Sequence, residues 1–120
     1  MSGKKIAYVE LPAADPAMVI TLKVFYGRAL GWDFQDWGES YAAFSAGLDG
    51  GINADTSHRT ASPLVIVKVE DLAATLEEVT LAGAVISRPP FEFPGGRRFH
   101  FIDPAGNELA AVQYDPTEPA

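Results

Sequence analysis

The sequence contains no cysteine, which excludes disulfide bonds, thiolate metal sites and cysteine nucleophiles. Basic residues are also scarce: nine lysines and arginines stand against sixteen aspartates and glutamates, and the formal net charge is −7. A chain with this balance repels a phosphate backbone. We therefore expect neither nucleic acid nor a membrane surface among its partners.

Long apolar runs are absent as well. No segment approaches the roughly 20 apolar residues that a membrane span needs. Pro12 and Asp15 interrupt the amino-terminal stretch too early for a signal peptide, and we expect a cytoplasmic protein. The 120 residues, 48% of them hydrophobic, suffice for one domain over residues 1–120 with a core of its own.

Two halves of the chain share one plan. Each half opens with a short apolar run rich in β-branched residues, which is typical of a strand. The runs end at Asp15 and Asp71, and an aspartate there can accept hydrogen bonds from the first free N–H groups of a helix. Apolar residues then recur at helical spacing, until Gly31 in the first half and Gly83 in the second.

Three more strand-like segments follow each predicted helix. They cover residues 32–37, 39–47, 50–53, 84–89, 97–103 and 108–114. The predicted fold class is therefore α+β, with two tandem βαβββ modules at about 6–53 and 64–114 and a linker at 54–63. The alternative is an ordinary α+β sandwich whose halves resemble each other by chance.

Four segments together resemble the vicinal oxygen chelate superfamily, the group of glyoxalases, bleomycin-resistance proteins and extradiol dioxygenases. They are VELPAADP (9–16), FYGRALGW (25–32), VKVEDLAATLEEVTLAGA (67–84) and FIDPAGNELAAVQ (101–113). The resemblance runs from Ile6 to Tyr114. It implies that the two modules form an incomplete barrel around a cleft, with the helices outside, and that the protein is a homodimer.

The faces of the predicted strands follow from the alternation of side chains along a strand. One set of faces is almost purely apolar, as a surface under a helix requires. The other set mixes polar groups with aliphatic ones, which is typical of a ligand-binding surface. This assignment places Tyr8, Glu10, Arg98 and His100 in the cleft.

The resemblance also implies where metal ligands would lie: at Tyr8, Leu64, Ala110 and a position near Ile52 or Asn53. Leucine and alanine offer no lone pair, and a single tyrosine is a poor ligand for Zn²⁺, Ni²⁺ or Mn²⁺. A divalent metal normally takes at least three protein ligands. We therefore expect no metal site and no cofactor.

The cleft residues suggest chemistry that needs no metal. His100 titrates near neutrality when unperturbed, and Glu10 would orient it, so these two are the candidate catalytic residues. Tyr8 would supply a hydroxyl group, and Arg98 would pair with a carboxylate or phosphate of a ligand. The alternative is that Glu10, Arg98 and His100 form a structural polar network.

Aromatic residues extend the predicted site. Trp37 and Tyr41 are candidates for the wall of a pocket that suits a flat organic ligand, with ordinary packing as the alternative. Residues 88–98 are predicted to be a loop between two strands. Phe91 and Phe93 would form a lid or a dimer contact there, and the alternative is a simple edge connection.

The sequence thus predicts a glyoxalase-like protein that binds a small organic molecule without the usual metal ligands. The expected ligand-binding residues are Tyr8, Glu10, Trp37, Tyr41, Arg98 and His100. One alternative is a metal-independent isomerase or lyase that uses His100 and Glu10. A further alternative is a metal-dependent lyase or dioxygenase. The expected partners are the small molecule and a second copy of the chain.

Overall fold

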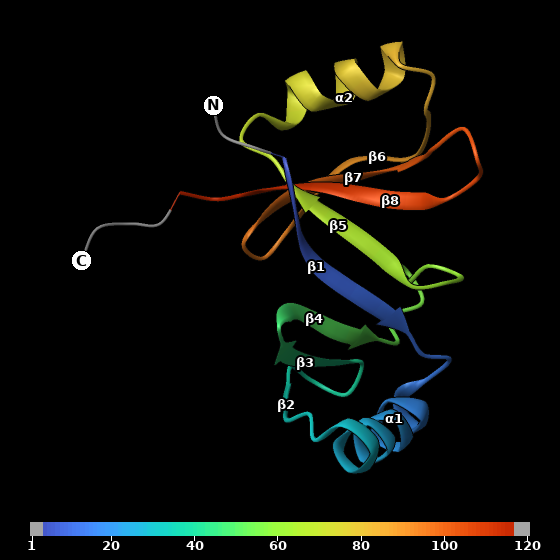
Figure 1. The fold of residues 1–120 in the computed structure, drawn as a ribbon, viewed down its shortest axis with the longest axis vertical. Helices are drawn as coiled ribbons and strands as arrows, with labels where there is room; N and C mark the ends of the chain where they lie inside the picture. The colour runs from blue at the N-terminus through green and yellow to red at the C-terminus, as the bar shows by residue number, and fades with distance from the viewer. Residues whose placement is uncertain (1–3, 117–120) are drawn as a thin grey trace. The chain divides into compact units, whose positions relative to one another are not determined.

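The computed structural model describes residues 4–116, which form two helices and eight strands. Their order along the chain is βαβββ twice, so the predicted α+β class and the two tandem modules are confirmed. Each helix lies against one side of the strands of its own module (Figure 1). Neither helix in residues 4–116 has the length and apolar character to cross a membrane.

The chain divides into two compact units. One is Tyr8–Leu64, and the other joins residues 65–116 with residues 4–7. The incomplete barrel around a cleft, which the family resemblance implies, stays a prediction.

The first module contains β1 (Lys5–Pro12), α1 (Pro16–Leu30), β2 (Phe34–Asp36), β3 (Tyr41–Ala46) and β4 (Leu48–Asn53). The Asp15 side chain accepts a hydrogen bond from the Met18 N–H at 2.8 Å, and Gly31 ends the helix in the left-handed region, as predicted. The strand order is β2-β3-β4-β1, with β1 parallel to β4. The core of the module consists of Ala13, Val19, Ala42, Phe44, Ile52 and Ala54.

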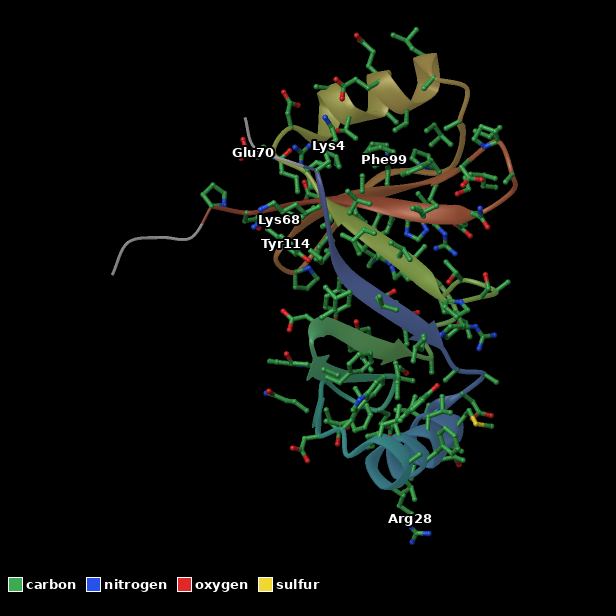
Figure 2. The ribbon with its side chains drawn as sticks, in the orientation of Figure 1. Lys4, Arg28, Lys68, Glu70, Phe99 and Tyr114 are labelled. Atoms are coloured by element: carbon green, nitrogen blue, oxygen red, sulfur yellow. The ribbon has the colours of Figure 1, made fainter. Side chains whose placement is uncertain are left out.

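The second module contains β5 (Leu64–Lys68), α2 (Leu72–Leu81), β6 (Val85–Phe93), β7 (Gly96–Ile102) and β8 (Glu108–Tyr114). Asp71 caps α2 by accepting from the Ala74 N–H at 3.0 Å. The strand order is β5-β8-β7-β6, with β5 parallel to β8. Val69, Leu72, Phe99 and Ala111 form the core, and Phe99 lies between α2 and the strands (Figure 2).

The prediction of a loop over residues 88–98 is wrong. Residues up to Phe93 belong to β6, which forms a hairpin with β7. Pro89 and Pro90 have no N–H to donate, but β6 lies last in the strand order, where a missing donor is tolerated. The pairing with β7 shifts register between Arg88 and Phe91, so the proline pair coincides with an irregularity in the ladder.

Candidate functional site

The sheet of the first module has one apolar face and one polar face, as predicted. Leu11, Ala42 and Ile52 share the side that packs under α1. Their neighbours in the strand register, Glu10 and Gly51, take the opposite side because side chains alternate.

A tyrosine–glutamate cluster occupies this polar face, and it consists of Tyr8, Glu10, Tyr41 and Asn53. The hydroxyl oxygens of Tyr8 and Tyr41 lie 2.6 Å apart. The Tyr41 hydroxyl donates to Glu10 Oε2 at 3.1 Å, and the Asn53 side-chain amide donates to Glu10 Oε1 at 3.4 Å. Glu10 is buried. Since Tyr41 gives its proton to Glu10, it accepts from Tyr8, and the hydrogen bonds run in one direction toward the carboxylate.

Gly51 makes room for this cluster. A Cβ atom at residue 51 would overlap the ring and the hydroxyl oxygen of Tyr41. The ring of Tyr41 therefore lies directly over the backbone of β4, where its hydroxyl reaches Glu10 on β1. The glycine pair at residues 50 and 51 thus has a packing role.

The electrostatics of the cluster keep Tyr41 protonated. Burial raises the pKa of Tyr41 far above its usual value, and the negative charge of Glu10 and the hydrogen bond with Tyr8 raise it further. A phenol in this state donates a hydrogen bond and does not act as a base. The cluster therefore offers hydroxyl groups and a carboxylate, all at fixed positions.

The second module carries a histidine–glutamate cluster of Ser87, His100 and Glu108. His100 Nδ1 lies 3.0 Å from Glu108 Oε2, and the Ser87 hydroxyl donates to the same oxygen at 3.0 Å. His100 is fully buried. Its Nε2 atom has no hydrogen-bond partner within residues 4–116.

Two aromatic rings flank Arg98, a charged neighbour of His100. The Arg98 guanidinium lies 5.4 Å from the ring centre of Phe91 and 5.9 Å from that of Phe93. The rings of Phe91 and His100 are 5.8 Å apart. Phe91 on β6 is the cross-strand partner of Arg98 on β7, so β6 supplies the aromatic rings beside Arg98 and His100.

The environment of His100 favours its neutral form. Burial lowers its pKa below the usual value, the hydrogen bond to Glu108 opposes that shift, and the charges of Arg98 and Arg88 add to it. A carboxylate can only accept, so the Nδ1–H of a neutral His100 donates to Glu108.

The structure brings three of the predicted site residues, Tyr8, Glu10 and Tyr41, into one hydrogen-bonded group. Arg98 and His100 lie two residues apart on β7, both buried. Trp37 is 63% exposed, and its backbone N–H donates to the Tyr41 carbonyl at 2.9 Å. The ligand contacts predicted for these residues stay predictions.

Sequence reasoning missed the carboxylate partner of His100. Glu108, a residue that the sequence analysis did not name, accepts the hydrogen bond from His100 Nδ1–H. A signal for Glu108 was present, because alternation along β8 places it on the same face as Ala110, which pairs with His100. Ser87 was also missed, within a segment predicted as a strand.

The residues at the expected metal positions do not fit a metal ion. The Tyr8 hydroxyl is hydrogen-bonded to Tyr41, and the Asn53 amide donates to Glu10. Leu64 and Ala110 are fully buried and have no side-chain donor atom for a metal. Across residues 4–116, no three histidine, aspartate or glutamate side chains come together as a metal site would require.

Known proteins share this sequence pattern and fold. The family model described as the Glyoxalase/Bleomycin resistance protein/Dioxygenase superfamily matches residues 5–111. No curated protein sequence matches the chain.

Several solved structures resemble the chain at low sequence identity. An NAD-dependent benzaldehyde dehydrogenase from Legionella pneumophila is 17% identical with a TM-score of 0.72, over 90% of this chain and 98% of that one. Methylmalonyl-CoA epimerase from Mycobacterium tuberculosis is 14% identical with a TM-score of 0.66, over 97% of this chain and 94% of that one. The Mn(II)-bound glyoxalase from Novosphingobium aromaticivorans is 18% identical with a TM-score of 0.65, over 98% of this chain and 42% of that one. At these identities the likeness shows the fold alone.

Proposed function

We propose that this chain, which belongs to the glyoxalase/bleomycin resistance protein/dioxygenase superfamily, binds a small organic molecule without a resident metal ion. The observation that carries the proposal is the tyrosine–glutamate cluster. It lies on the sheet face turned away from α1. Its member Tyr8 stands at one expected metal position, and Asn53 stands at or next to another.

The cost of burying these groups supports a binding role. A buried carboxylate with its hydroxyl and amide partners is no more stabilising than well-packed apolar side chains of the same volume. Such groups are characteristic of sites in which a few fixed polar atoms orient a ligand. The hydroxyls of Tyr8 and Tyr41 and the carboxylate of Glu10 supply those atoms here.

Aromatic residues near the polar groups favour a flat ligand. Tyr41 presents its ring over β4, and Trp37, which is exposed, directly follows β2. In the second module, Phe91 contacts both Arg98 and His100. A metal-independent isomerase or lyase is the second candidate function, and the neutral His100 held by Glu108 is the observation that favours it.

The first expected result concerns metal content. Protein purified without chelator or polyhistidine tag should contain much less than one equivalent of divalent metal, because Leu64 and Ala110 cannot act as ligands. Elemental analysis by mass spectrometry measures this directly. Adding Mn²⁺, Ni²⁺ or Zn²⁺ should leave the Tm unchanged, since only a bound ion stabilises the folded state. One tightly held metal per chain would overturn the metal-free proposal.

The second expected result concerns ligand binding. Thermal melting with a panel of benzoate, catechol and 4-hydroxybenzaldehyde should find a compound that raises the Tm. At a concentration of 100 times Kd the gain is about 2.7 kcal/mol. Tyr41→Phe should weaken that binding by about tenfold, because it removes one hydroxyl from the cluster.

Tyr26→Phe is the matched control for this experiment. Tyr26 belongs to the same module but packs against the core under α1, where it stacks on Trp32. Its substitution should leave the ligand-induced rise in Tm intact. If both variants bind equally well, or if no compound binds, the tyrosine–glutamate cluster is not the binding site.

A further inference from the structure

We propose that Glu108 fixes His100 in the tautomer with its proton on Nδ1, so that the buried Nε2 accepts a hydrogen bond from a neutral ligand O–H, a phenol in the simplest case. The inference rests on the proposed function, because it names the chemical class of the small molecule. It adds a site on the second module and a positioning residue, Glu108.

The hydrogen bonds around Glu108 determine the tautomer. Oε2 of Glu108 lies 3.0 Å from His100 Nδ1 and accepts from the Ser87 hydroxyl at 3.0 Å. A carboxylate has no proton to offer, so the proton between Glu108 and the imidazole lies on Nδ1. A neutral imidazole carries one proton, which leaves a lone pair on Nε2.

That lone pair has no donor within the described residues. The Nε2 atom is buried and makes no hydrogen bond there, although buried polar atoms are nearly always paired. Ala110 on β8 is the cross-strand partner of His100, and its side chain has no polar atom. A hydroxyl group of a bound molecule would supply the missing donor.

The charges around His100 select among possible donors. Arg88 faces it from β6, Arg98 lies two residues away on β7, and Glu108 contacts it from β8. Two positive charges disfavour a cationic donor such as an ammonium group. They favour an oxygen that becomes more negative as it donates, which describes a phenol or an enol. The ring of Phe91, 5.8 Å from His100, suits an aromatic ligand.

Nitrogen NMR of the labelled protein tests the tautomer. The chain has only two histidines, so a His58→Gln variant assigns both rings. In the unaltered protein we expect Nε2 of His100 to show the shift of an unprotonated nitrogen and Nδ1 that of a protonated one. Glu108→Gln is nearly isosteric, and its amide can both donate and accept. That variant should show a mixture of the two tautomers.

A pair of small probes tests the ligand class. Phenol should move the Nε2 resonance of His100 and bind up to about tenfold more tightly than anisole, which has the same ring but no donor. His100→Phe keeps a ring of similar size and should abolish that difference. Benzylammonium should not bind.

The outcomes separate this proposal from the proposed function. A proton on Nε2 in the unaltered protein, or equal affinity for phenol and anisole, would overturn the inference about His100. The inference is also overturned if a buried water donates to Nε2 and phenol leaves the Nε2 resonance unmoved. If a compound of the panel still binds in a manner that depends on Tyr41, the proposed function stands while this inference fails.

Discussion

Replacing Gly96 with alanine is expected to lower the free energy of unfolding by about 2–3 kcal/mol, the cost of overpacking a well-filled site. Gly96 opens β7 and pairs with Tyr114 of β8. A Cβ atom at residue 96 would overlap the carbonyl oxygen of Gln113 and lie 3.0 Å from the Cα atom of Tyr114. These are backbone atoms of the neighbouring strand, so no side-chain rotation relieves the contact. Urea unfolding measures the loss as a lower midpoint.

Gly27→Ala is the matched control, since it makes the same chemical change inside α1. A Cβ atom there would meet only the carbonyl oxygen of Trp32, at an ordinary 3.6 Å. Alanine in a helix interior is favoured over glycine by roughly 0.5–1 kcal/mol, so this variant should be more stable than the parent. If Gly96→Ala unfolds at the parent's urea midpoint, β8 does not lie against β7 as described.

The order of elements could be predicted from the sequence because local chemistry determines it. Asp15 and Asp71 mark the helix starts through their side-chain oxygens, and Gly31 marks the end of the first helix through its left-handed backbone. Alternation along β7 likewise separated Phe99, which packs under α2, from His100 on the other face. Each of these signals lies within a few residues of the feature that it predicts.

The failures involve information that a local pattern does not carry. Two consecutive prolines indicate a loop in most contexts, and only the position of β6 at the end of the strand order allows them inside a strand. The pairing of His100 with Glu108 depends on the register between β7 and β8, which places residues eight positions apart in contact. Register depends on tertiary packing, so parity alone identified the face and not the partner.

The tyrosine–glutamate cluster shows the same limit. Tyr8 and Glu10 were assigned to one face from a single strand. Asn53 was considered as a position for a metal ligand, and its hydrogen bond to Glu10 follows from the parallel pairing of β1 with β4. The position of Tyr41 over β4 further requires the absence of a side chain at Gly51. The sequence therefore predicted Tyr8, Glu10 and Tyr41 as site residues, and it left their hydrogen bonds and the role of Asn53 to the structure.

The Tyr41 phenol should make the protein sensitive to alkali. Its pKa is raised in the folded state, by burial first and by the charge of Glu10 second. In the unfolded chain, by contrast, a tyrosine phenol ionises near pH 10. The stability that this group contributes is therefore complete below pH 10 and is lost as the pH rises above it. Since the unfolded state releases one more proton, stability should fall by an additional 1.4 kcal/mol or so for each pH unit above 10.

Comparison with Tyr41→Phe isolates this contribution, because every other ionisable group is present in both proteins. Urea unfolding at pH 9, 10, 11 and 12 should give a steeper loss of stability for the parent than for Tyr41→Phe, with the difference absent at pH 9. Equal slopes for the parent and Tyr41→Phe would mean that Tyr41 ionises as readily in the folded protein as in the unfolded chain. In that case its hydroxyl would not be held between Tyr8 and the carboxylate of Glu10 in solution.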